Sequence, residues 1–147
     1  MNSIKNLLKP DYERYEGVRR INIYLLRLIY GLAFLFVGFD SWSYLLKFNG
    51  TWDHVRAVAF CVWAAYSTLF FFGLINPLKM LPLMIFMIFY KVLWLIVVAY
   101  PLWSADKLSG SPAEQMTYTF IWVIVPIIAV PWKYTFNNYV LRSKKNE

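Results

Sequence analysis

Four long apolar segments, separated by short polar stretches, dominate the pattern of this 147-residue chain. The first three reach or approach the roughly 20 residues that a helix needs to cross a bilayer, and the fourth is near the lower limit of about 17. Backbone groups in hydrocarbon must be satisfied within their own segment, so we expect each segment to be a helix. The segments are residues 21–39, 55–75, 81–103 and 116–132.

Short connections favour antiparallel neighbours among these helices. The tightest connection, residues 73–82, contains Pro77 and Pro82, which stop one helix and start the next. No small-residue cleavage site follows the first segment, so we expect it to be a retained span rather than a cleaved signal. We therefore predict an all-α integral membrane protein, an antiparallel four-helix bundle. Its parts are an interfacial segment (1–20), the four-helix domain (21–136) and a basic tail (137–147).

Composition and charge agree with this class. The chain is 60% hydrophobic and only 16% charged, far from the average soluble domain. Three cationic residues (Lys47, Arg56, Lys107) lie on one side of the predicted membrane and eleven on the other, so the positive-inside rule puts both termini in the cytoplasm. The expected location is the bacterial cytoplasmic membrane. The eleven are Lys5, Lys9, Arg14, Arg19, Arg20, Arg27, Lys79, Lys133, Arg142, Lys144 and Lys145.

The net charge of +7 is explained by anionic lipid headgroups, so we expect the lipid bilayer rather than nucleic acid as partner. Cysteine and histidine usage excludes several kinds of redox and metal site. One cysteine, Cys61, and one histidine, His54, rule out an internal disulfide, a bis-histidine haem and a three-histidine metal site within one chain. We expect no metal and no intrinsic cofactor. A redox centre would have to be an organic molecule such as a quinone, or belong to a partner.

Lys91 is the ionisable residue that stands out, because it lies about ten residues from either end of the third segment. Its Cα would lie about 15 Å from each interface, beyond the reach of snorkelling. An ionisable residue at this depth is a functional hypothesis with a partner to be named. No acid of the chain is expected at that depth. The alternatives are the Trp122 carbonyl freed by Pro126, a hydroxyl of the second segment, a ligand, or another subunit.

The candidate ligand-binding residues around this amine would hold the polar head of a quinone or lipid, whereas the simpler interpretation is core packing. They are Lys91, Tyr66, Trp94 and Trp122.

A second group of polar residues gathers where the first two segments meet on the outer side: Asp40, Asp53, His54 and Arg56. One interpretation is an ion pair that closes the helical hairpin. The other is a proton-handling or ligand-binding mouth, because histidine titrates near neutral pH.

The first segment carries the pattern R-x-x-x-G-x-x-F-x-x-x-G at Arg27, Gly31, Phe34 and Gly38. The second ends in Gly73-Leu74, followed by a short basic turn and a methionine-rich third segment. Together these features resemble the DoxX-like family of small four-helix membrane proteins.

The resemblance covers about residues 20–105. It implies a four-helix bundle associated with quinone-linked redox complexes, often as a small accessory subunit. Family members often carry a lysine shortly after the second glycine of the first helix, where this chain has Asp40.

We therefore expect an accessory subunit without a catalytic site of its own, partnered by a membrane or periplasmic oxidoreductase. The catalytic residues are unknown. One alternative is a structural or assembly protein without ligand. The other is a small carrier with Lys91 in its pathway, completed by a homo-oligomer.

Overall fold

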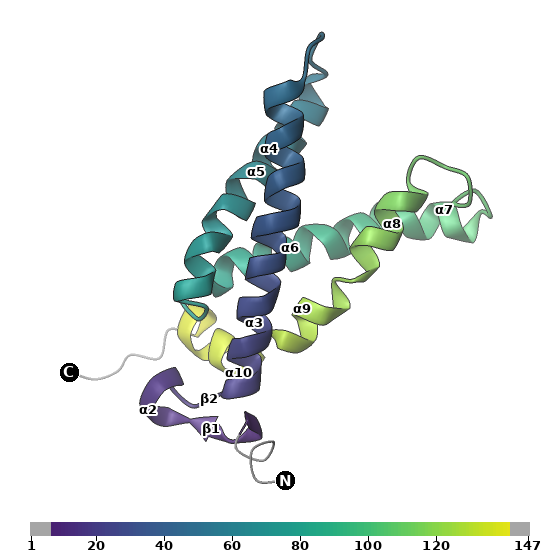
Figure 1. Cartoon of the computed structure of the whole chain (residues 1–147). Helices are drawn as coiled ribbons and strands as arrows, with labels where there is room; N and C mark the ends of the chain where they lie inside the picture. Colours follow the sequence, from purple (N-terminus) through teal and green to yellow (C-terminus); the bar gives the residue numbers. More distant parts are fainter. Residues whose placement is uncertain (1–6, 142–147) are drawn as a thin grey trace. The chain divides into compact units, whose positions relative to one another are not determined.

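The computed structural model describes residues 7–141 as an almost wholly helical chain (Figure 1). The all-α prediction is confirmed in this respect, apart from one small β-hairpin near the N-terminus. The chain forms two compact units, one ending at Leu81 and the other beginning at Pro82. The predicted four-helix bundle and its topology stay predictions. Lys5, Arg142, Lys144 and Lys145, four of the predicted inner cations, lie outside the described residues.

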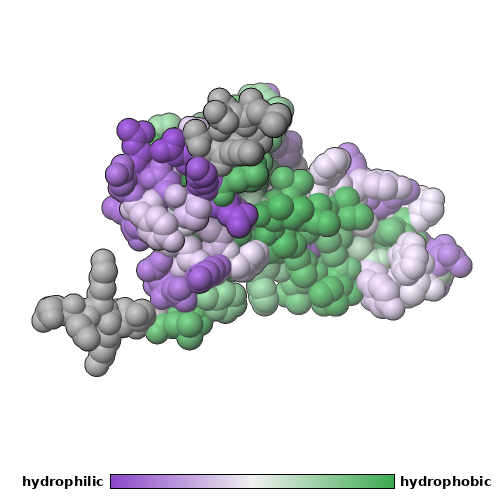
Figure 2. Space-filling view, turned by 90° about the horizontal axis from the view of Figure 1, so that it is seen from below, coloured by the Kyte–Doolittle hydropathy of each residue, from purple (hydrophilic) through white to green (hydrophobic). Residues whose placement is uncertain are grey.

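The first unit begins with a β-hairpin around a single helical turn. Strands β1 (Pro10–Asp11) and β2 (Val18–Arg19) pair antiparallel, and α2 (Tyr12–Tyr15) lies between them. The chain reverses at Gly17, whose φ of +82° is unfavourable for other residues. Figure 2 views the molecule from the end that carries this hairpin, and hydrophilic residues gather there.

Asp11 holds the hairpin together and connects it to the first long helix. Its Oδ1 accepts a hydrogen bond from the Arg14 backbone N–H at 3.1 Å, and its Oδ2 pairs with Arg20 Nε at 2.8 Å. The hydrogen bond from the Arg14 backbone has the largest effect, and together with the bond from Arg20 it holds the pKa of the Asp11 carboxyl below its ordinary value. The interfacial segment expected before the first span thus ends in a defined structure.

The first long helix is a continuous run of three parts, 28 residues from Arg20 to Lys47. They are α3 (Arg20–Leu32), the π-helical turn η1 (Ala33–Val37) and α4 (Gly38–Lys47). At about 1.5 Å per residue the helix is about 42 Å long, enough for the hydrocarbon core and both headgroup layers. The apolar stretch 21–39 begins one residue after this helix begins but ends eight residues before it ends, because the polar residues after Phe39 lower the hydropathy without breaking a helix.

The second long helix, α5 (His54–Ile75), packs antiparallel on the first. Gly31 lies against Leu74, and Gly38 lies against Ser67. From Gly31 to Gly38 the first helix advances by seven residues, and from Leu74 to Ser67 the second helix goes back by seven. The two antiparallel helices therefore keep one register over this length. Gly31 and Gly38, the two glycines of the first-segment pattern, are therefore packing residues of this helical hairpin.

Tyr30 and Gly73 make the closest contact of the hairpin. An added Cβ at Gly73 would lie 2.6 Å from Tyr30 Cγ, so the ring occupies the space of the missing side chain. Tyr30 is fully buried, its hydroxyl donates to the Pro77 carbonyl at 3.2 Å, and its ring meets Phe70 edge to face. Position 73 therefore requires glycine, because the Tyr30 ring lies against its backbone.

The second unit contains the third long helix, a continuous run from Leu81 to Ser104. Its parts are α6 (Leu81–Trp94), the π-helical turn η2 (Leu95–Ala99) and α7 (Tyr100–Ser104). The predicted segments 55–75 and 81–103 correspond closely to α5 and to this run.

The fourth segment differs from the expected single helix over residues 116–132. It consists of α8 (Glu114–Ile121) and α9 (Ile124–Ala129), followed by α10 (Trp132–Thr135) and the π-helical turn η3 (Phe136–Val140). The interruption between α8 and α9 lies four residues before Pro126, where the proline ring would meet a helical carbonyl. Val130, which precedes Pro131, is extended, and the chain bends by 76° there.

Three helices are long and apolar enough to cross a membrane, and the bent fourth segment makes four if it counts as one span. Only 28%, 28% and 22% of the most apolar windows of the first three helices are buried within the protein. Their surfaces are therefore mostly exposed hydrocarbon, which a bilayer covers and water would not. These are the properties of an integral membrane protein.

Candidate functional site

Lys91 lies deep in the third long helix, ten residues after Leu81 and thirteen before Ser104. These intervals correspond to about 15 and 20 Å along the helix axis. The side chain is partly buried, and its ammonium lies 5.3 Å from the centre of the Phe120 ring. Among residues 7–141, it forms no ion pair or hydrogen bond. The face of an aromatic ring is therefore its favourable electrostatic contact.

An aromatic cluster from α6 and α8 surrounds the Lys91 contact. The Phe120 ring is buried, and both Tyr90 and Trp94 meet it edge to face, at 5.7 and 5.2 Å between centroids. Tyr90, Lys91 and Trp94 lie within one turn and a half of α6, so one face of that helix presents an amine flanked by two rings. Of the predicted ligand-binding residues, the structure brings Lys91 and Trp94 together around Phe120.

Trp122 lies elsewhere, as an exposed residue at the interruption between α8 and α9. Its carbonyl, expected to be freed by Pro126 and to attract Lys91, accepts a hydrogen bond from the Val125 N–H at 3.0 Å. The chain thus satisfies this carbonyl locally with a tighter turn. Lys91 faces Phe120 instead.

The hydroxyls expected to help Lys91 lie in the first unit and have structural contacts there. Ser67 and Thr68 both donate to the Ala64 carbonyl, at 3.0 and 2.7 Å. Tyr66, the fourth predicted ligand-binding residue, is buried and meets Phe70 edge to face.

The outer polar group also differs in detail from a closing ion pair. Asp53 caps α5 through its Oδ1, which accepts from the Arg56 N–H at 2.7 Å. The Arg56 guanidinium lies over the rings of Tyr44 and Phe60, at 5.1 and 5.9 Å. Within residues 7–141, Asp40 forms no ion pair with Arg56 or with His54. A helix cap and cation–π contacts therefore close this end of the hairpin.

The described residues contain no group of three histidine, cysteine or acidic side chains that would hold a metal ion. The acids described in the second unit, Asp106 and Glu114, lie in the connection before α8 or in its first turn. Glu114 accepts a hydrogen bond from the Gly110 N–H there. The chemistry at Lys91 is that of an amine among rings.

Sequence reasoning missed Phe120. Nothing in the spacing of the fourth segment distinguishes it from neighbouring apolar residues, because the register between two helices is not readable from either one. Asp11 and Arg20 were also missed. Two signals pointed to their ion pair. Asp11 precedes Arg14 by three residues, the spacing of a helix N-cap, and Gly17 marks a turn that brings the chain back toward Asp11.

The long apolar helices place this chain in the class of multi-pass membrane proteins. Comparisons with models of protein families, with curated proteins and with solved structures find no match.

Proposed function

We propose that this chain is an accessory subunit of a quinone-linked redox complex. In this proposal it lies in a bacterial cytoplasmic membrane as an antiparallel four-helix bundle, with both termini in the cytoplasm. The observation that carries the proposal is Lys91, an amine in the middle of a membrane-crossing helix, whose favourable contact is the Phe120 ring. Such a group is expensive in hydrocarbon and is usually functional.

A quinone matches the chemistry around Lys91. Its carbonyl oxygens accept hydrogen bonds, which an ammonium donates strongly in a low-dielectric setting. Its flat ring can pack on Trp94 or Phe120, and its apolar tail stays in the bilayer. Lys91 would orient and hold the head group. Electrons would come from the partner, because the chain has one cysteine, and residues 7–141 contain no group of three histidine, cysteine or acidic side chains that could bind a metal ion.

The DoxX-like pattern supports the same proposal independently of Lys91. It is the resemblance, rather than the contacts of Lys91, that suggests an accessory role beside an oxidoreductase. The charge distribution of the sequence supports the orientation with both termini inside.

Quinone retention tests the proposal. The full chain, produced in quinone-containing bacterial membranes and purified in a mild detergent, is extracted with organic solvent, and quinone per chain is measured by chromatography. Lys91→Met keeps volume and removes the amine, and Lys107→Met is the matched control in an exposed connection. We expect quinone with the wild type and with Lys107→Met. We expect about 10- to 100-fold less with Lys91→Met, the loss of one charged hydrogen bond.

The other outcomes identify the alternatives. Absence of quinone from all three proteins, with unchanged stability, refutes the quinone proposal and favours a structural protein. Equal retention by the wild type and Lys91→Met contradicts the role of Lys91. A carrier would make position 91 reachable from water, so Lys91→Cys in a Cys61→Ser background would react with a water-soluble thiol reagent.

A further inference from the structure

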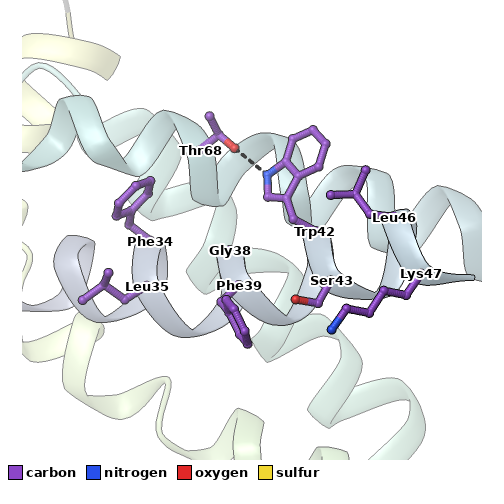
Figure 3. A pocket seen from close by; sticks show the side chains of 9 residues that line it. All are labelled: Phe34, Leu35, Gly38, Phe39, Trp42, Ser43, Leu46, Lys47 and Thr68. Carbon is purple, nitrogen blue, oxygen red and sulfur yellow. Dashed lines mark hydrogen bonds between the residues drawn. The ribbon is translucent and has the colours of Figure 1, made fainter.

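A groove of about 440 Å³ runs along the C-terminal half of the first long helix, within the first unit (Figure 3). It extends from η1 to the end of α4. The length of helix between Phe34 and Lys47 is about 20 Å at the rise of an α-helix. One leaflet of a bilayer contributes about 15 Å of hydrocarbon. The groove therefore has the length of one lipid chain with its glycerol. Its apolar walls are Phe34, Leu35, Gly38, Phe39, Trp42 and Leu46.

The local structure keeps this groove open and shaped. Gly38 lines the groove at its middle, and it also lies against Ser67 of α5, so this part of the wall is backbone held by the packing of the two helices. The Trp42 indole is fixed because its N–H donates to Thr68 Oγ1 at 3.0 Å, as Figure 3 shows. That bond occupies the polar atom of Trp42 and leaves its ring as an apolar wall. The groove is thus prepared for hydrocarbon along most of its length.

One end of the groove is polar and positively charged. Lys47 and Ser43, one helical turn apart on α4, both line it, and Figure 3 shows the ammonium and the hydroxyl at the same end. Within residues 7–141, Lys47 forms no ion pair. Tyr44 and Trp52 pack together near this end, as aromatic residues do at membrane interfaces. A cation and a hydroxyl therefore lie at one end of an otherwise apolar groove.

We propose that this groove binds one anionic phospholipid, with an acyl chain along Phe39 and Leu35 and the phosphate on Lys47 and Ser43. Charge complementarity selects this occupant, because Lys47 at the polar end forms no ion pair with any described residue. Asp40 lies seven residues before Lys47, about 10 Å deeper along the helix. It therefore lies below the phosphate, where it cannot meet the ammonium of a zwitterionic headgroup. Lys91 is not among the residues that line this groove.

Lipid titration of the purified full chain tests this site. Phosphatidylglycerol and phosphatidylcholine with the same acyl chains are added to the protein in detergent, and bound lipid is counted by native mass spectrometry. We expect one phosphatidylglycerol to bind in preference to phosphatidylcholine. Lys47→Gln should weaken phosphatidylglycerol about fivefold, the effect of one lysine at an anionic surface, and leave phosphatidylcholine unchanged. Lys47→Arg should retain the preference.

Lys79→Gln is the matched control, an exposed lysine in the connection after α5, outside the groove. It should leave binding of the first lipid unchanged, and dihexanoyl phosphatidylglycerol should bind more weakly because its chains are too short for the groove. Equal binding of the two headgroups by the wild type overturns the proposal, as does an equal loss with Lys79→Gln. Equal affinity for short and long chains overturns the groove as the binding element. A quinone or a second copy of the chain in place of the lipid also overturns it.

Discussion

Gly73→Ala tests the contact on which the helical hairpin depends. The new Cβ would lie 2.6 to 2.7 Å from three ring atoms of Tyr30, far inside normal contact distance. The ring cannot retreat freely, because it is fully buried and its hydroxyl donates to the Pro77 carbonyl. Overpacking of this kind costs about 1–3 kcal/mol. The better helix propensity of alanine offsets at most about 1 kcal/mol of this loss in stability.

Gly31→Ala is a control within the same pair of helices. Its Cβ would lie 3.3 Å from Leu74 Cδ2, the end of a flexible side chain that can rotate away. We therefore expect this variant to be neutral or slightly more stable than the wild type. Gly73→Ala should be less stable than Gly31→Ala by about 2 kcal/mol, since it adds the same methyl group against the middle of a fixed ring.

The free energy of unfolding in mixed micelles, measured by titration with sodium dodecyl sulfate and followed by circular dichroism, gives the comparison. A double-mutant cycle with Tyr30→Ala isolates the clash: in that background Gly73→Ala should cost little, with a coupling energy of about 1–3 kcal/mol. Equal stability of Gly73→Ala and Gly31→Ala, or a coupling energy near zero, would refute the reasoning.

Three further predictions concern other parts of the chain. The nuclear magnetic resonance signal of the Arg14 amide should titrate with Asp11 at a midpoint below about 3.9, because its hydrogen bond and that from Arg20 lower the pKa. The Asp11 carboxylate therefore stabilises the folded protein at pH values above its ordinary pKa, and this stabilisation is lost as the pH falls through the lower pKa of the folded state. A midpoint at or above about 3.9 contradicts this prediction, and so does an unchanged titration in Asp11→Asn. Trp42→Phe removes the hydrogen bond to Thr68 and should lower the free energy of unfolding by about 0.6 kcal/mol, and no effect would show that the bond is not formed in the micelle. Pro126→Ala restores an amide and should join α8 and α9, so that this amide exchanges slowly with deuterium; rapid exchange would show that packing, not proline, separates the helices.

Hydropathy alone predicts the long helices, because a bilayer makes apolar length the dominant signal. It does not predict where the first helix ends. Asp40 and Ser43 lower the apolar signal, but neither residue breaks a helix, and the helix continues to Lys47. The interruption of the fourth segment was only partly foreseeable. Pro126 marks the place, but whether the chain bends or is interrupted depends on how the Trp122 carbonyl is satisfied, here by Val125.

The candidate sites were predictable as residue types and not as contacts. Lys91 stands out by depth, yet its ring partner Phe120 depends on the register between α6 and α8, which no single-helix pattern contains. Arg56 was grouped with Asp40 because opposite charges suggest an ion pair. Nearby Tyr44 offered a cation–π contact, which needs no second charge at the membrane interface.

The register of the helical hairpin is held at both ends by side chains and not by the connection between its helices. Tyr30 lies against Gly73 at one end, and Tyr44 stacks on Phe60 at 3.8 Å at the other. The connection after Lys47 can therefore grow without moving the helices, since doubling the length of a loop costs only about 0.6 kcal/mol. An epitope inserted after the exposed Gly50 would be displayed by an intact hairpin, and antibody access to it in sealed vesicles would report the orientation of the whole chain.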